Sequence, residues 1–350
     1  MNKTIQINDT QIGEQQPVYI IAELSANHEQ NLDLAIATIK AMKEAGADAV
    51  KVQTFTPDSI TLDADQQWFR TREDSLWAGR RLYDLYQEAY TPWEWHAQLK
   101  KLVEDLGMDF FSSPFAKSDV DKLETLEVPA YKIASFEISD IPLISYVAQK
   151  GKPVIMSTGI AKESDIQLAV ETCRKAGNDQ LALLKCTSSY PTPMDQVNLA
   201  TIPTIAQKFE TIAGLSDHTL GIEVPLGAVA LGAKIIEKHF VLDRNGNGLD
   251  KDFSLTPDEF KNMVDSVRKI ELAIGSAEIT LTEKQEKARV SGRSLFAIQD
   301  IEEGDIFTEE NVKSLRPALG LHPKYLPDIL GKKALVAIER GAPLEEKHFL

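Results

Sequence analysis

The sequence has little cysteine, fewer basic than acidic residues and no long apolar run. Its two cysteines, Cys173 and Cys186, exclude a disulfide framework and predict two reduced thiols. The formal net charge of −15 argues against nucleic acid or an anionic membrane surface as a partner. The N-terminal residues lack the apolar core of a signal peptide, and no segment approaches the length of a membrane span. These absences predict a cytoplasmic protein.

Short apolar runs alternate with amphipathic stretches through most of the chain. The runs are rich in Val, Ile, Leu and Ala, as in parallel strands that are covered on both faces. Several amphipathic stretches, such as 32–45 and 94–106, predict helices. Eight repeats predict a (β/α)8 barrel. A doubly wound open sheet is the alternative, but no G-x-G-x-x-G follows the first run, which disfavours its dinucleotide-binding form. The predicted strands are 18–23, 49–53, 109–113, 130–133, 153–157, 181–186, 212–216 and 234–240.

The barrel pattern stops at residue 275, and we expect three successive parts. Residues 1–275 would form the barrel, the charged stretch 276–290 a linker, and residues 291–350 a small β-rich domain. A domain this small buries little surface, so we expect it to dock on the barrel or on a partner subunit. One pattern occurs twice within it at a constant offset, which predicts two similar halves. The matched positions include Ala297, Ile301 and Gly304 in the first half, and Ala334, Ile338 and Gly341 in the second.

Polar residues gather at the carboxyl ends of the predicted strands, where the active sites of barrels lie. His218 and His239 follow neighbouring strands, which brings two imidazoles within reach of one divalent ion. A hydrogen bond from one histidine to the other, or to a serine, is the structural alternative. Glu237 shares a face with His239, and we expect it to orient an imidazole. Lys238 and Asp217 point to the opposite face, which indicates a structural role.

Lysines and serines at the same rim predict an anion site. Lysine supplies positive charge and serine hydroxyls donate hydrogen bonds, which suits phosphate and carboxylate together. Taken singly, each serine would be a helix cap and each lysine would reach solvent. Their concentration on one rim favours a site instead. The residues are Lys51, Lys132, Ser113, Ser135, Ser157, Ser188 and Ser216.

Eight segments spread along the chain form an ordered set of motifs. They are IAELSANH, AGADAVKVQTF, FSSPF, YKIAS, PVIMSTG, LLKCTSSYPTP, GLSDHTLG and IIEKHFVLDR. In order and spacing these segments resemble the motifs of the bacterial sialic acid synthases, and the resemblance covers the whole chain. The resemblance implies a TIM barrel followed by a SAF (antifreeze-like) domain, in a domain-swapped homodimer whose small domain reaches the partner's active site. It also implies condensation of phosphoenolpyruvate with an open-chain N-acetylated hexosamine, with release of phosphate.

The resemblance also implies a role for each matched residue. His218 and His239 would hold Mn2+, with Mg2+ or Co2+ as alternatives. Glu23 resembles a sugar-handling residue of the family, and either Glu23 or a metal-bound water would move protons. Ser188 departs from the family, which usually has Asn there. The implied phosphoenolpyruvate site is Lys51, Ser113, Lys132, Ser135, Ser157, Ser188, Tyr190 and Ser216; the implied sugar site is Gln53, Asp250 and Arg316, with Arg316 supplied by the partner's small domain.

Two segments resemble the pseudaminic acid synthase branch of that family. They are ELSANH, in place of an ELGINH-like form, and LWAGRRLYDLYQEAYTPWEWH. The acceptor of that branch is 2,4-diacetamido-2,4,6-trideoxy-L-altrose, which lacks the 6-hydroxyl. Residues 56–90 are too long for a simple loop and predict an active-site loop or lid. Trp68, Trp77 and Tyr83 would either line a drier pocket or pack this segment on the barrel. N-acetylneuraminate or legionaminic acid synthesis and a non-catalytic sugar- or phosphate-binding barrel are the alternatives.

Overall fold

The computed structural model describes residues 3–73 and 75–349. The chain divides between Gly275 and Ser276 into two compact units. Across the described residues, none of the helices combines the length and apolarity needed to cross a membrane. The two units are described separately below.

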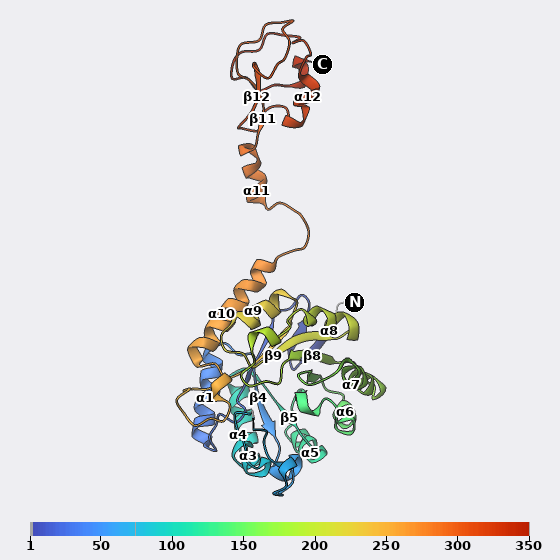
Figure 1. Cartoon of the computed structure of the whole chain (residues 1–350), viewed down its shortest axis with the longest axis vertical. Coiled ribbons are helices and arrows are strands. Elements are labelled where there is room, and N and C mark those ends of the chain that lie inside the picture. Colours follow the sequence, from blue (N-terminus) through green and yellow to red (C-terminus); the bar gives the residue numbers. More distant parts are fainter. Residues whose placement is uncertain (1–2, 74, 350) are drawn as a thin grey trace. The chain divides into compact units, whose positions relative to one another are not determined.

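The first unit is a closed barrel of eight parallel strands (Figure 1), which confirms the predicted fold and excludes the open sheet. Each strand pairs with the next along the chain, and the last closes on the first. All of the predicted strands are present. They are β3 (Tyr19–Glu23), β4 (Ala49–Thr54), β5 (Asp109–Pro114), β6 (Tyr131–Ile133), β7 (Val154–Ser157), β8 (Leu181–Cys186), β9 (Ile212–Asp217) and β10 (Ile235–His239).

Helices surround the barrel (Figure 1) because their apolar faces pack on the outward side chains of the strands. Val50, Val52 and Phe110 are fully buried in this outer layer. The helices are α1 (Leu32–Glu44), α2 (Pro57–Ile60), α3 (Leu82–Ala89), α4 (Trp93–Asp105), α5 (Lys117–Thr125), α6 (Ile141–Ala148), α7 (Glu163–Lys175), α8 (Thr201–Phe209), α9 (Glu223–Ala230) and α10 (Pro257–Ile274).

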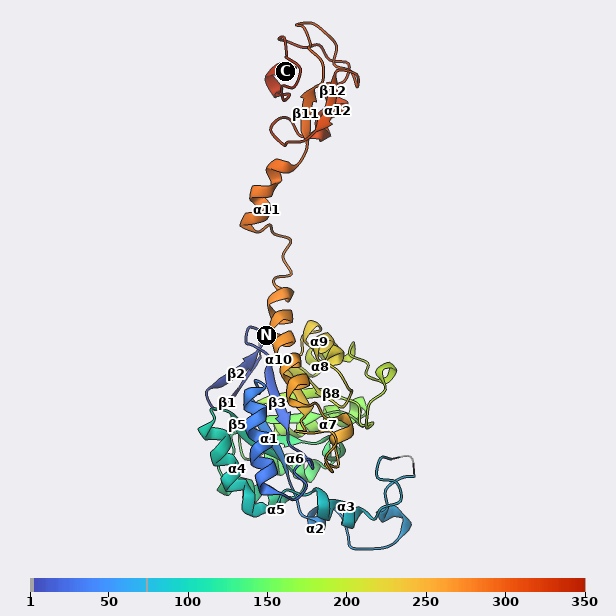
Figure 2. The same cartoon turned by 90° about the vertical axis from the view of Figure 1, so that its left-hand side faces the viewer.

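An antiparallel hairpin of β1 (Thr4–Ile7) and β2 (Thr10–Gly13) precedes the barrel and was not predicted. Its buried Ile5, Ile7 and Ile12 pack with inward-facing residues that include Tyr19 and Phe111. The hairpin and the α2–α3 segment lie at opposite ends of the barrel (Figure 2). The amino-terminal half of the interior is therefore filled mainly with apolar side chains, with Asp109 bonded there to the Tyr19 hydroxyl. The polar residues of the predicted site lie toward the carboxyl ends of the strands.

The second unit contains α11 (Glu283–Ala288), the antiparallel pair β11 (Ser294–Ala297) and β12 (Val312–Leu315), and α12 (Leu326–Ile329). Helix α11 lies within the predicted linker. The repeat seen in the sequence is a structural repeat, because matched positions of the two halves exchange equivalent backbone hydrogen bonds. Ile301 N donates to Ile338 O (2.9 Å) and Ile338 N to Ile301 O (2.8 Å), while Gly304 N donates to Ala334 O and Gly341 N to Ala297 O, both at 2.8 Å.

Candidate active site

A cavity of about 580 Å³ opens at the carboxyl end of the barrel strands. The strands supply many of its polar side chains. The segment between β4 and β5 supplies an apolar wall of Ile60, Trp77, Leu82 and Leu85 together with the polar side chains of Arg70, Thr71, Arg72 and Ser75. Most of the predicted site residues line this one cavity. They are Lys51, Gln53, Ser113, Lys132, Ser135, Ser157, Tyr190, Ser216, His218, His239 and Asp250.

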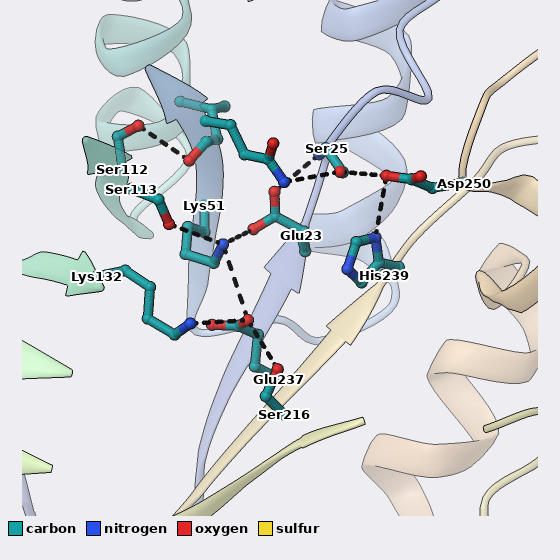
Figure 3. A network of polar contacts seen from close by, with 12 residues as sticks. Glu23, Ser25, Lys51, Ser112, Ser113, Lys132, Ser216, Glu237, His239 and Asp250 are labelled. Carbon is teal, nitrogen blue, oxygen red and sulfur yellow. Dashed lines mark hydrogen bonds and ion pairs between the residues drawn. The ribbon is translucent and has the colours of Figure 1, made fainter. Parts of the chain in front are cut away.

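Four buried charges form the base of the site (Figure 3). Glu23 on β3 stands in register with Lys51 on β4, and the two side chains form an ion pair. Glu237 on β10 reaches across the barrel to both lysines. Its Oε1 lies 3.8 Å from Lys51 Nζ and 3.6 Å from Lys132 Nζ, and it accepts a hydrogen bond from Ser216 Oγ at 3.2 Å. The prediction that Glu237 orients an imidazole is therefore wrong, because its contacts are the lysines and Ser216.

The burial of this cluster shifts the pKa values of its members. Burial raises the pKa of Glu23 to about 7, although Lys51 opposes the shift. Burial also raises the pKa of Glu237, but the positive charges of Lys132 and Lys51 outweigh burial and hold the pKa of that carboxyl below its usual range. Burial also lowers the pKa of Lys132, and Glu237 opposes that shift. Glu237 thus favours the charged form of Lys132.

Serine hydroxyls stand around the lysines, as expected for an anion site. Ser113 Oγ lies 3.4 Å from Lys51 Nζ, and Ser135 Oγ accepts from the backbone N–H of Gly159 at 3.0 Å. Ser157 Oγ is buried and has no hydrogen-bond partner among the described residues. A buried hydroxyl without a partner is costly unless a ligand satisfies it. These three serines therefore offer donors to a bound anion.

Ser188 stands beside this group, although it is not one of the residues that line the cavity. Gly159 packs tightly against it. A Cβ atom added at Gly159 would lie 2.2 Å from Ser188 Oγ and 2.7 Å from Ser135 Oγ. Only a glycine leaves room for both hydroxyls at this position.

His218 and His239 lie side by side, with ring centroids 5.2 Å apart. Phe253 packs edge-on against both rings, and Tyr190 packs against His218 at 4.7 Å. His239 Nδ1 is buried without a hydrogen-bond partner among the described residues; it lies 3.7 Å from Asp250 Oδ2. Burial and the positive charge of His218 hold the pKa of His239 well below its usual range. His239 is therefore neutral at physiological pH, which is the form that binds metals.

The histidine pair fits a divalent metal ion. Two protein nitrogens at an open cavity leave coordination positions for water and substrate. No hydrogen bond joins the two rings, which argues against the structural alternative. Across residues 3–73 and 75–349, no group of three or more His, Cys, Asp or Glu side chains is arranged to hold a metal. Any ion here would thus rely on His218 and His239 together with non-protein ligands.

The two outward-facing residues beside these histidines pair with each other, as the sequence predicts. Lys238 Nζ donates to the Asp217 carboxylate and to the Thr219 carbonyl oxygen. Both side chains are buried under the helices. This pair ties the end of β9 to the end of β10, one residue from each histidine.

The sugar-site residues are only partly brought together. Gln53 and Asp250 line the cavity and share one neighbour, Ser25. Arg316 lies in the second unit, exposed and directly after β12. The sequence analysis missed Ser25 because its contribution depends on an unusual backbone conformation.

Glu137 is a second residue that the sequence analysis missed. It lies in the one-turn helix Ser135–Glu137 after β6 and lines the cavity. Its Oε2 is buried without a hydrogen-bond partner within the described chain, and burial raises its pKa to about 7. The sequence pattern that marks the site is a polar residue at the end of an apolar run. Glu137 lies beyond the end of its strand, so this pattern does not identify it.

The segment between β4 and β5 contributes one of its three named aromatic residues to the cavity. Trp77 lines the cavity and packs near Tyr190, with ring centroids 6.1 Å apart. Trp68 is 69% exposed, and the Tyr83 hydroxyl bonds Asp58. The prediction that Trp68 and Tyr83 line the pocket is therefore wrong. Apolar side chains of α2 and α3 take their place.

Comparison with known proteins identifies the family. The sequence pattern of the NeuB family matches residues 38–279, and that of the SAF domain matches residues 292–350. The chain belongs to the NeuB family. It is 50% identical to a pseudaminic acid synthase of Campylobacter jejuni over 95% of this chain and 96% of the relative. A pseudaminic acid synthase of Helicobacter pylori is 46% identical over 94% of this chain and 97% of the relative.

Solved structures of similar sequence share the same architecture. A spore coat polysaccharide biosynthesis protein of Bacillus subtilis is 36% identical and matches 99% of both chains with a TM-score of 0.68. This likeness supports the expected NeuB-type barrel with a C-terminal SAF domain, and the predicted resemblance to sialic acid synthases is confirmed at the level of the family.

Proposed function

We propose that this NeuB-family chain is a pseudaminic acid synthase. It would condense phosphoenolpyruvate with 2,4-diacetamido-2,4,6-trideoxy-L-altrose and water, giving pseudaminic acid and phosphate. The observation that carries the proposal is that one cavity holds both a buried lysine–serine cradle and a pair of imidazoles. The identity of 46–50% to pseudaminic acid synthases over nearly the whole chain supports this choice of product.

The anion cradle suits phosphoenolpyruvate. Lys51 and Lys132 supply positive charge at the base of the cavity, and Ser113, Ser135 and Ser157 supply hydroxyl donors around it. The net charge of the chain is −15, and the two lysines are paired with Glu23 and Glu237, so the cradle offers an anion two local cations and not a net positive field. Phosphoenolpyruvate bears both a phosphate and a carboxylate, and the cradle has cations and donors for each.

The condensation needs a group that takes and returns a proton near neutral pH. A bond forms from C3 of phosphoenolpyruvate to the aldehyde carbon of the open-chain sugar, whose oxygen gains a proton. Water then adds at C2 and loses a proton, and phosphate leaves with its bridging oxygen. Glu23 suits this work because its pKa is about 7 and it pairs with Lys51 beside His239. Glu137, with a pKa also about 7, is the second candidate proton carrier.

His218 and His239 would hold the divalent ion, for which Mn2+ is our proposal. When bound, such an ion supplies Lewis-acid polarisation of the sugar aldehyde and positive charge near the phosphoenolpyruvate anion. The neutral state of His239 and its unpartnered Nδ1 support this assignment. Phe253 and Tyr190 pack around the rings and restrict their rotation.

The apolar wall favours a 6-deoxy acceptor over N-acetylmannosamine. Ile60, Trp77, Leu82 and Leu85 line the cavity where the segment between β4 and β5 covers it. A methyl group gains where it meets these apolar side chains, whereas a 6-hydroxyl placed against them would lose its hydrogen bonds to water; Arg70, Thr71, Arg72 and Ser75 of the same segment line other parts of the cavity. The wall does not separate the pseudaminic from the legionaminic precursor, so that choice rests on the relatives.

Arg316 would complete the sugar site from a partner subunit in a domain-swapped homodimer. The proposal follows from the family resemblance, and the exposed position of Arg316 after β12 leaves its guanidinium available to a ligand. This arrangement would give each site residues from two chains.

Phosphate release tests the proposed function. The protein is assayed with phosphoenolpyruvate, Mn2+ and one of three sugars: the altrose, the legionaminic acid precursor or N-acetylmannosamine. We expect release with the altrose at a kcat/KM at least about 10-fold above the others. Release with N-acetylmannosamine but not the altrose would refute the proposed substrate, and release with none would favour the non-catalytic barrel. His239→Ala serves as the inactive control.

A further inference from the structure

Ser25 has a backbone conformation that serine rarely adopts. It lies two residues after the end of β3 and has φ 46°, in the left-handed region that favours glycine. The residue is 2% exposed, so solvent does not compensate for the strain. Non-glycine residues in this region persist where surrounding contacts hold them, often at functional sites. Glycine occupies this position in the ELGINH-like form of the motif, whereas the present chain has ELSANH.

Three hydrogen bonds hold Ser25 in place, and all of them reach site residues. Its backbone N–H donates to Glu23 Oε1 at 2.9 Å. Its hydroxyl donates to the Asp250 carboxylate and accepts from Gln53 Nε2 at 3.0 Å. The hydroxyl has a single proton, so donation to Asp250 leaves its lone pairs for Gln53. Ser25 therefore links Glu23, the proposed proton carrier, with Asp250 (Figure 3) and also with Gln53.

The loop that carries Asp250 is anchored separately, so Ser25 is not needed to attach it to the barrel. Asn27 Oδ1 accepts from the backbone N–H of Asp250 at 3.2 Å, and Asn27 Nδ2 donates to Phe240 O and to Ser254 Oγ. These bonds fix the backbone. The contribution left to the Ser25 hydroxyl is the orientation of the Asp250 and Gln53 side chains.

We infer that Ser25 is a positioning residue for the sugar acceptor, an inference that rests on the proposed function. With its amide nitrogen bound to Ser25, Gln53 keeps its carbonyl oxygen as an acceptor for an acetamido N–H or a hydroxyl of an open-chain sugar. With one oxygen bound to Ser25, Asp250 presents its carboxylate in one orientation toward the same ligand. Glycine would relieve the backbone and leave both side chains unlinked.

Two variants distinguish the contribution of the Ser25 hydroxyl from the effect of its strained backbone. Ser25→Ala removes the hydroxyl and keeps a side chain in the left-handed conformation, whereas Ser25→Gly removes both the hydroxyl and the strain. Glu210→Gly is the matched control, because Glu210 ends α8 with φ 51°, is exposed and lies outside the cavity. Melting temperature and steady-state kinetics are measured for all three proteins and the wild type.

We expect both Ser25 variants to lose about 10-fold or more in kcat/KM for the sugar, while KM for phosphoenolpyruvate stays within about twofold. We expect Ser25→Gly to melt ~2 °C or more above Ser25→Ala, since glycine relieves the strain. Glu210→Gly should melt at or above the wild type with unchanged kinetics.

Unchanged sugar kinetics in either Ser25 variant would overturn the inference, as would an equal loss toward both substrates. The comparison uses whichever sugar the wild type turns over best. A wild type that uses another sugar, or none, counts against the proposed function, whereas an active wild type with equally active variants counts against Ser25 alone.

Discussion

Replacing Glu237 with glutamine tests how the buried charges hold the anion site. Glu237 Oε1 lies 3.6 Å from Lys132 Nζ, and both side chains are buried. At an effective dielectric constant near 20, two charges at this distance attract by about 4 kcal/mol, which corresponds to about 3 pKa units. Burial already lowers the pKa of Lys132, and Glu237 opposes that shift. Glu237→Gln therefore moves the pKa of Lys132 further down.

The sign of the effect on binding follows from the charge of Lys132. Below its pKa the ammonium is intact and holds phosphoenolpyruvate; above it the amine is neutral and the anion loses one cation. In Glu237→Gln, KM for phosphoenolpyruvate should rise about 10-fold or more as the pH increases from 6 to 9. In the wild type the same rise should begin at a pH at least ~1 unit higher.

The assay is phosphate release at saturating sugar across that pH range. Glu104→Gln is the control, because Glu104 pairs with Lys100 on the exposed face of α4. A KM for phosphoenolpyruvate that has the same pH dependence in Glu237→Gln and wild type would refute the reasoning.

Four further predictions follow from the described contacts. Lys238→Met leaves the buried Asp217 carboxylate without its cation, so it should lower the free energy of unfolding by about 3 kcal/mol and the melting temperature by ~6–12 °C. The double variant Lys238→Met with Asp217→Leu should recover most of that stability, and no recovery would contradict the pairing. Gly159→Ala crowds the serine hydroxyls and should lower kcat/KM for phosphoenolpyruvate about 10-fold, and unchanged kinetics would show that the cradle tolerates a methyl group. His239→Ala should abolish calorimetric Mn2+ binding with an unchanged circular dichroism spectrum, whereas retained binding would move the metal elsewhere. Mixed subunits of Arg316→Ala and His239→Ala should recover part of the activity, and no recovery at any ratio would count against a site shared between chains.

The sequence predicts the barrel and most of the cavity lining because both follow from local patterns. Apolar runs mark the strands, and a polar residue at or just after the end of a run marks the rim, which identifies His218, His239 and Gln53. The period of two along a strand also places Lys238 and Asp217 on the outer face, as the structure confirms.

The contacts that cross the barrel could not be predicted in the same way. Glu237 on β10 meets Lys132 on β6, although these strands are not neighbours in the sheet. A side-chain period gives the face of a residue but not its partner across the interior. The hairpin β1–β2 was missed because its strands have four residues each, too few for a clear alternation. Ser25 was missed because nothing in a sequence reports a left-handed backbone at a serine.

The most direct test of the central claim is the fate of oxygen during turnover in ¹⁸O-labelled water. The protein is given phosphoenolpyruvate, Mn2+ and the altrose, and both products are analysed by mass spectrometry. If this cavity joins the two substrates, pseudaminic acid forms and the released phosphate carries no label, because water attacks C2 and the bridging oxygen leaves with phosphorus. Labelled phosphate without pseudaminic acid would show attack of water at phosphorus and would contradict the proposed function.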